Sequence, residues 1–470
     1  MKQIPATLEM GNLAVPETKI DVPRHRKQVV QEAASSGLVY YLKCFFDLGY
    51  LVVLIPFWIG TTTRNGNLAF TFMKTNRLHK SICIAFQTLI VAEFVLVIRL
   101  IPKWNELNEK RINILHSGNL IACLLYSLAL IYIFWSKKDV FLKIFDQLGE
   151  GRSSSGSGSK EEGGNQHFWS TLRVKAFGYG ICILGYAGAM THPVIHHAFI
   201  FPEDNTASFY QRMKVQAETC FLMADLNETT QTAVPPGNEG SLYTIVSFIF
   251  TVIHIIMIIP STVLVHMLDL FALLTTICCW RVVNKFLRDC KRLESSLVGL
   301  DDAEGLAEVI LDKYDNLKAF INNVNNATGL VFLCCIGISL PFYASFTAVL
   351  FFEEKIDWFE TIHFYVYFIT FLIVLTLAAN INKKANEFYD WISTSPIALT
   401  IHPNQMTLLM MDLYSNRIAL SGCGVFSLTF RFFVTILSII VTYTSIIVQL
   451  QISRRDATLL LMGNSTRALG

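Results

Sequence analysis

The sequence predicts an all-α integral membrane fold: seven transmembrane helices plus an N-terminal amphipathic or re-entrant helix, with a cytosolic N-terminus and an extracellular C-terminus. Three observations predict it. Only 16% of the 470 residues are charged, whereas a soluble domain carries about 25%. Hydrophobic residues make up 53% of the chain and gather in long blocks, and about 18 apolar residues suffice to cross the hydrocarbon core. Lys and Arg are shared unequally among the connecting segments.

Eight apolar segments follow one another along the chain. Backbone groups in lipid must bond internally, so each segment is predicted to be helical. The first contains Lys43 and Asp47 and ends near Gly49 and Pro56, which favours an amphipathic or re-entrant helix over a full span. The other seven are the predicted spans. The segments are 38–59, 81–102, 113–136, 174–200, 242–281, 327–353, 361–381 and 421–450.

The distribution of positive charge gives the orientation. If the first segment does not cross, the loops on the side of the N-terminus hold 24 Lys and Arg, and those on the other side hold 9. Cytosolic loops carry the excess of Lys and Arg, so the N-terminus is predicted to be cytosolic. The acceptors Asn227 and Asn464 then both lie outside and are predicted to be glycosylated.

The connecting segments complete the predicted organisation. Residues 151–165 are rich in Gly and Ser and predict a flexible stretch. The 242–281 block is twice as long as a span needs to be, so its helix is expected to project from the bilayer toward 282–326. The predicted regions are a cytosolic N-terminus (1–37), the amphipathic or re-entrant helix (38–59), transmembrane helices 1–4 (81–281) with a flexible cytosolic insert (137–173) and an extracellular loop (201–241), a cytosolic helical anchor (282–326), transmembrane helices 5–7 (327–450) and an extracellular tail (451–470).

The sequence offers no residue set for catalysis. It contains no Gly-rich phosphate loop, GxSxG or HExxH motif, so neither an enzyme nor a cofactor is predicted. The 11 Cys lack zinc-type spacing. His192 and His196 share a helix face but have no third ligand nearby, so they are interpreted as interfacial and no metal is predicted. A net charge of +2 gives no case for a nucleic-acid partner.

The last apolar segment carries a recognisable pattern. Gly424 and Phe426 stand at its start, and Thr442, Tyr443 and Gln449 near its end. This spacing resembles the signature of the final transmembrane helix in insect gustatory receptors, which has Thr-Tyr, five mostly hydrophobic residues, and Gln-Phe. The short first helix, the stretch 314–329 and the stretch 378–387 are also similar to that family.

The chain departs from the family pattern at three positions. Thr444 and Ser445 are polar where the pattern is usually apolar, and Leu450 stands in place of Phe. Sugar-type members have Glu after Thr-Tyr, so Thr444 disfavours a sugar ligand and leaves bitter or other tastants open.

The resemblance implies a taste receptor that is a ligand-gated, non-selective cation channel, opened by small-molecule tastants in the plasma membrane of a sensory neuron. It implies a homomeric or heteromeric tetramer with other gustatory receptors around one pore, which the seventh helix lines. The residues implied for the pore and gate are Thr442, Tyr443, Val448, Gln449 and Leu450. The outer halves of the helices offer, as an aromatic pocket with a few polar groups, Tyr186, His192, Phe250, His254, Phe342, Tyr343, Tyr365 and Phe368.

Other classes of membrane protein make different demands on the sequence. An odorant receptor of the sister family shares the architecture, but the Thr-Tyr…Gln spacing favours the gustatory branch. A G-protein-coupled receptor needs an outside N-terminus and usually an Asp-Arg-Tyr box, and the charge distribution opposes it. A transporter would move its substrate without large currents, and the chain has no internal repeat of the kind many transporters share.

Overall fold

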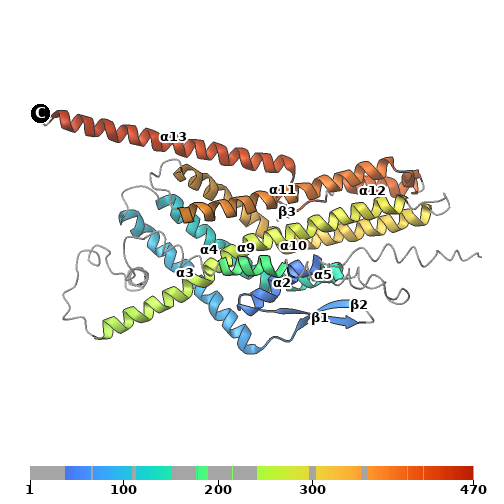
Figure 1. The fold of residues 1–470 in the computed structure, drawn as a ribbon, viewed down its shortest axis with the longest axis horizontal. Helices are drawn as coiled ribbons and strands as arrows, with labels where there is room; N and C mark the ends of the chain where they lie inside the picture. The colour runs from blue at the N-terminus through green and yellow to red at the C-terminus, as the bar shows by residue number, and fades with distance from the viewer. Residues whose placement is uncertain are drawn as a thin grey trace, which may run out of the picture.

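A computed structural model describes most of the chain, and every structural statement below concerns those residues. They are 38–64, 67–107, 113–149, 176, 178–188, 214, 217, 241–295, 303–350, 358–399, 401–415 and 418–468. Long helices run roughly side by side, and two small antiparallel hairpins interrupt them (Figure 1). The elements are α2 (Leu38–Leu51), β1 (Trp58–Arg64), β2 (Asn67–Met73), α3 (Arg77–Leu107), α4 (Asn113–Ser136), α5 (Lys138–Gly149), α9 (Ser241–Ser295), α10 (Ala303–Leu350), α11 (Trp358–Thr394), η4 (Pro396–Leu399), α12 (Pro403–Ser415), β3 (Ser421–Gly422), β4 (Phe426–Ser427) and α13 (Phe430–Ala468).

Where the structure describes the predicted spans, helices occupy all of them except the start of the last one. Within the described part, four helical stretches are long and apolar enough to cross a membrane, and they lie in α9, α10, α11 and α13. The predicted segments 81–102 and 113–136 fall in α3 and α4, and residues 178–188 of the predicted third span are also helical. The hydropathy blocks therefore located the helices.

The first segment is shorter than the predicted range 38–59. The helix α2 ends at Leu51, and the chain turns at Val53, whose φ is +62°. Residues Trp58–Arg64 and Asn67–Met73 then pair as the antiparallel hairpin β1–β2, where the sequence analysis placed only a loop. These strands are rich in Thr and Phe, which favour extended backbone, and the intervening Asn65-Gly66 is the dipeptide most typical of two-residue hairpins.

The predicted flexible insert 137–173 begins with a packed helix, so that prediction is wrong for its first third. Helix α5 buries Phe141, Ile144, Phe145 and Leu148, which recur at helical spacing and join the main core. The Gly/Ser-rich stretch 151–165 lies outside the described residues.

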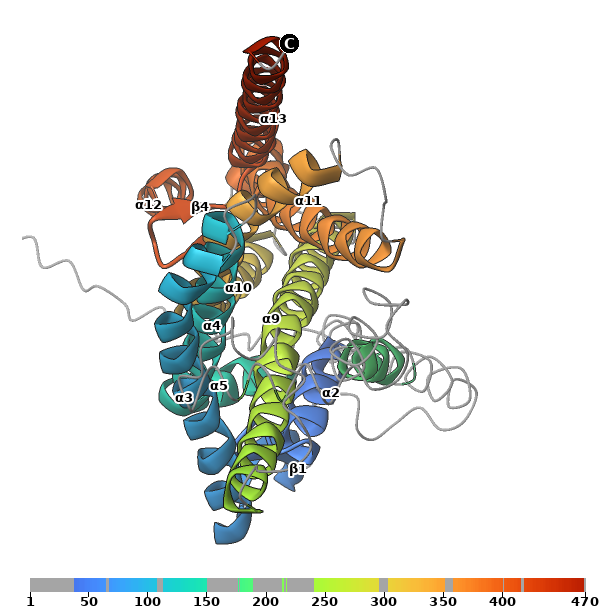
Figure 2. The ribbon, with the colours of Figure 1, turned by 90° about the vertical axis from the view of Figure 1, so that its left-hand side faces the viewer.

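The helix α9 is long enough for the expected projection beyond the bilayer. Its 55 residues make a rod about 80 Å long, more than twice the hydrocarbon thickness. It contacts α2, α3, α4, α10 and α11 and so lies at the centre of the bundle (Figures 1 and 2). The predicted loop 382–420 is also mostly ordered, because α11 continues to Thr394 and is followed by η4 and α12.

The last helix begins later and ends later than predicted. Residues 421–428 form the hairpin β3–β4, and the helix α13 starts only at Phe430. It then continues to Ala468 through most of the predicted extracellular tail. Both views show α13 diverging from the other helices toward the C-terminus (Figures 1 and 2).

Candidate functional site

The apolar part of α13 packs less against its own subunit than any other candidate span. In the apolar stretch of α13 that could cross a membrane, 11% of the residues are buried, compared with 61% in the corresponding stretch of α9. Its buried face consists of Ile436, Ile440 and Thr444, which recur every four residues. The Thr444 hydroxyl donates to the carbonyl oxygen of Ala344 in α10, at 3.3 Å. The rest of the helix surface is open to lipid, water or another chain.

A stripe of polar side chains runs along the face opposite the buried one. The spacing alternates between three and four residues, so the side chains align along one side of the helix. All five are exposed, although lipid-facing positions in a membrane helix are normally apolar. We name the set the polar stripe: Thr435, Ser438, Thr442, Ser445 and Gln449.

Hydroxyl groups of the polar stripe bond back to their own helix. Thr435 donates to the carbonyl of Arg431 at 2.9 Å, and Thr442 donates to that of Ser438 at 2.8 Å. Each hydroxyl oxygen keeps its lone pairs on the exposed side. The stripe therefore presents a row of acceptors and one carboxamide, which suits water or a partly hydrated cation.

The five residues implied for the pore do not share one face. At about 100° per residue, Thr442 and Gln449 lie on the polar stripe, while Tyr443 and Leu450 lie together on a neighbouring apolar face, 58% and 60% exposed. Val448 is half-buried on the other side, toward the subunit. The sequence analysis noted Ser445 as a polar departure from the family pattern but missed Thr435 and Ser438, although their spacing was visible in the sequence.

Three of the predicted pocket residues meet between α10 and α11. The ring of Tyr343, 3% exposed, packs 5.4 Å from Phe342 and 5.0 Å from Phe368, centroid to centroid. Phe364 and Phe371, at 5.6 and 5.2 Å from Tyr343, complete this aromatic cluster and were not predicted. Such a cluster is a largely buried group of aromatic rings with one hydroxyl at its centre.

The other predicted pocket residues are dispersed. Tyr365 is half exposed beside Phe364, and Phe250 and His254 lie on α9, half-buried and buried. Tyr186 packs against α2 instead, where its hydroxyl donates to the carbonyl of Phe45 at 3.2 Å. His192 lies outside the described residues.

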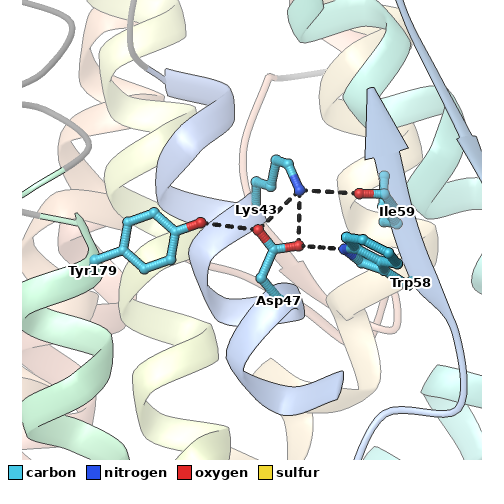
Figure 3. Close-up of polar contacts among 5 residues, drawn as sticks. All are labelled: Lys43, Asp47, Trp58, Ile59 and Tyr179. Atoms are coloured by element: carbon cyan, nitrogen blue, oxygen red, sulfur yellow. Dashed lines mark hydrogen bonds and ion pairs between the residues drawn. The ribbon is translucent and has the colours of Figure 1, made fainter. Parts of the chain in front are cut away.

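A polar cluster holds α2 in place, and the sequence indicated only two of its members (Figure 3). Lys43 bonds both carboxylate oxygens of Asp47 at 2.8 Å and donates to the carbonyl of Ile59 at 3.0 Å. The indole N–H of Trp58 and the hydroxyl of Tyr179 each donate to Asp47 at 3.0 Å. The cluster joins α2, the strand β1 and the helical stretch 178–188, and its half-buried charges are all bonded.

The predicted glycosylation sites remain predictions. Asn227 lies outside the described residues, and the backbone at Asn464 is part of α13 and not of a non-helical tail. Within the described part, no three His, Cys, Asp or Glu gather as metal ligands would.

Comparison with known proteins places the chain in a family. The family described as "Trehalose receptor" matches residues 205–458, more than half of the chain. Among solved structures, the insect olfactory receptor OR5 from Machilis hrabei aligns with a TM-score of 0.55 at 10% identity, over 87% of this chain and 98% of that chain. The same receptor in complex with eugenol aligns with a TM-score of 0.49 at 10% identity, over 91% of this chain and 99% of that chain. No curated protein matches.

The two kinds of likeness carry different weight. At 10% identity, the structural match with a TM-score of 0.55 establishes the fold, and it confirms the predicted all-α, multi-pass membrane architecture. The family match begins in the extracellular loop expected at 201–241 and ends at residue 458 within α13, and so includes the polar stripe. The chain belongs to the trehalose receptor family, in the gustatory branch of the insect chemoreceptors.

Proposed function

We propose that this protein is a taste receptor that opens a non-selective cation pore when a small-molecule tastant binds. The observation that carries the proposal is the polar stripe on α13, which lies on a face that the rest of its own subunit leaves uncovered. Polar side chains inside membrane segments normally face a bundle interior or a water-filled path. A water-filled path along α13 needs further copies of the helix to enclose it.

Assembly into a tetramer would enclose the water-filled path, because the other three subunits supply the remaining sides of the pore. Four copies of α13 around one axis would turn their polar stripes inward, while Tyr443, Ile446 and Leu450 on the next face would contact the neighbouring subunit or lipid. Because the apolar side chains face the neighbouring subunit or lipid, only the polar stripe lines the pore, with hydroxyl groups and a ring of Gln449 amides. The other subunits can be identical or other gustatory receptors.

Gating fits the order of residues near the end of the stripe. Val448, Gln449 and Leu450 point to three different sides of α13, so rotating the helix changes whether an amide or an apolar side chain faces the axis. An apolar constriction closes a pore by excluding water. A tastant favours the open arrangement only by binding it more tightly than the closed one.

The aromatic cluster around Tyr343 is the proposed tastant site. Asp269 of α9 lies near the cluster, where its carboxyl group accepts a hydrogen bond from the thiol of Cys335 in α10 at 3.6 Å. Aromatic faces with a nearby acceptor suit a ligand that has both apolar faces and hydroxyl groups. The name of the family makes trehalose the first compound to test, although Thr444 replaces the Glu of sugar-type members.

Localisation and modification follow from the same proposal. A cation channel that reports tastants acts in the plasma membrane of a sensory neuron. The proposed orientation places Asn227 outside the cell, where it can carry a glycan, as could Asn464.

Whole-cell recording from cells that express this receptor alone tests the proposal. Trehalose, other sugars and bitter compounds are applied with G-protein signalling blocked. We expect a cation current that survives the block. With surface expression verified, a response that the block abolishes would contradict the channel mechanism, and flux of the compound without current would indicate a transporter.

The role of Gln449 is tested in the same cells. Replacing Gln449 by Ala removes the amide ring, so single-channel conductance or the open probability is expected to change severalfold. The matched control is Ile446→Ala, one turn earlier and off the stripe, which should leave the single-channel conductance unchanged. Unaltered conductance and gating in Gln449→Ala would contradict the proposed pore.

A further inference from the structure

The hairpin β3–β4, with the residues just before it, joins α13 to the rest of the subunit. We name residues 418–428 the pre-helix hairpin. Ile418, Ala419, Leu420 and Leu428 are all buried, although the segment has only two short strands. Leu428 N–H closes the hairpin on the carbonyl of Leu420 at 2.8 Å. A short segment buried this well is held by its neighbours more than by its own pairing.

Asn325 of α10 holds the entry strand of the pre-helix hairpin through both ends of its side-chain amide. Its Nδ2 donates to the carbonyl of Ala419 at 2.9 Å, and its Oδ1 accepts the N–H of Ser421 at 3.0 Å. A carboxamide presents one acceptor and one donor group side by side, as a neighbouring strand would. Asn325 therefore stands in for a third strand. Asn382 of α11 adds a longer bond to the carbonyl of Ile418, at 3.4 Å.

Gly329 allows α10 and the pre-helix hairpin to touch backbone to backbone. It lies one turn after Asn325 on the same face of α10. A Cβ at this position would lie 2.9 Å from the amide nitrogen of Cys423 and 3.4 Å from the carbonyl oxygen of Ser421. Both obstacles are main-chain atoms, so neither can swing aside. Any residue larger than Gly must push the hairpin off the helix.

The pre-helix hairpin is joined just as firmly to α13. Phe426 stacks on Phe432 in the first turn of α13, with centroids 4.6 Å apart and planes 11° from parallel. Thr429 caps the helix by accepting the N–H of Phe432 on its hydroxyl at 3.2 Å. Displacement of the hairpin is therefore passed to the start of α13.

We propose that Asn325 and Gly329 form a clamp that makes α10, the pre-helix hairpin and the base of α13 move as one body, and that Asn325 is a positioning residue for gating. The consequence for gating rests on the proposed channel function, whereas the clamp itself does not. Tyr343 of the aromatic cluster is also on α10, just beyond Pro341, so the proposed tastant site and the base of the pore helix are joined by one continuous helix. Coupling between two sites requires such an element, whose arrangement both sites bias.

Two pairs of variants test the clamp in the full-length receptor. Asn325→Ala removes both hydrogen bonds to the hairpin, and its control Asn323→Ala removes one bond from the same helix to Gln147 of α5, at 3.0 Å. Gly329→Ala introduces the collision, and its control Gly337→Ala adds a methyl group to α10 where no atom lies within 4 Å. Both Gly variants gain the same helix propensity, so a difference between them reports the collision.

Hydrogen exchange on the purified receptor measures directly how firmly the clamp holds the pre-helix hairpin. In Asn325→Ala and Gly329→Ala, the amides of residues 418–428 are expected to exchange about tenfold faster than in the wild type, because local opening no longer breaks these contacts. The two controls should exchange there like the wild type. Equal exchange in all five proteins would overturn the clamp.

Current recordings with trehalose as the probe read the gating role. We expect the maximal current per surface receptor to fall about tenfold in the two clamp variants, since the coupling free energy is lost, and to stay near wild type in the controls. Faster exchange with unchanged current would overturn the gating role. A wild-type receptor that is silent to trehalose would count against that ligand, and the exchange measurement would still decide whether the clamp exists.

Discussion

Two regions of this receptor, the anchor end and the membrane part of α13, differ in how much their side chains contact the rest of the subunit. The anchor end, formed by the C-terminal parts of α9 and α11, the N-terminal part of α10, and α12, is packed and cross-bonded. Glu294 accepts the indole N–H of Trp391 at 2.7 Å and the hydroxyl of Ser395 at 2.5 Å. Asp412 of α12 accepts from Tyr314 at 3.1 Å and from Lys318 at 2.5 Å.

The membrane part of α13 has few such contacts. Its tie to the facing helix is the bond from Thr444 to Ala344, and large side chains such as Val441 and Tyr443 are more than half exposed. In lipid, the apolar faces gain little by packing. The contrast teaches that the anchor end holds the subunit together, whereas α13 is left available for partners and for movement.

The largest expected effect contrasts the same truncation in the two regions. Phe388 is 1% exposed and packs against Phe286, Tyr314 and Trp391. Replacing it by Ala should destabilise the receptor by about 3–5 kcal/mol through the cavity left behind. Tyr443→Ala on α13 should stay within about 0.5 kcal/mol. Thermal unfolding in detergent checks both, and equal losses would remove the distinction between the regions.

A smaller effect is expected from a polar contact of the anchor end. In Glu294→Ala the donors of Trp391 and Ser395 lose their acceptor, which should cost about 1–3 kcal/mol. The control Glu308→Gln changes an exposed carboxylate on α10 and should leave the unfolding temperature unchanged. A Glu294→Ala receptor as stable as the wild type would mean that α9 and α11 do not depend on this contact.

The smallest effect on stability is expected on the polar stripe, where a substitution should act on the single-channel conductance instead. Thr442→Val keeps the shape of the side chain and removes an exposed hydroxyl from the polar stripe, so stability should change by less than about 0.5 kcal/mol. Single-channel conductance should fall severalfold, because an apolar group replaces an acceptor along the ion path. Val441→Thr, off the stripe, is the control. Lost stability together with unchanged conductance would assign Thr442 to packing.

Local features of the sequence predicted the helices but not their ends. The hydropathy blocks gave the spans, and the length of the 242–281 block gave the projecting helix α9. The β1–β2 hairpin was not predicted, although Asn65-Gly66 signals it, because long hydrophobic blocks indicate membrane spans and say nothing of short strands between them. The start of α13 was misplaced because residues 421–429 include Cys, Val, Phe and Leu and join the apolar block without a charged residue between them. In the structure, Cys423 and Gly424 turn the chain there, with φ of +52° and +76°.

The candidate sites were predictable to different degrees. The Thr-Tyr…Gln spacing identified α13, and the polar stripe was visible as residues at alternating three- and four-residue spacing. The aromatic cluster was predicted in part, through Phe342, Tyr343 and Phe368. The contact of Tyr186 with α2 could not be predicted, because its hydrogen-bond partner Phe45 is 141 residues away in the sequence.

The sequence by itself determined that this protein is a helical membrane protein, which segments are apolar enough to enter the bilayer, and which family signature its last helix carries. These properties depend on hydrophobicity and short-range spacing, and both are local. The tertiary structure alone decided which face of α13 is buried, that Asn325 holds Ser421 across 96 positions, and that Gly329 is where two backbones touch. Contacts between distant segments depend on how the helices pack, and no single stretch of sequence encodes that packing.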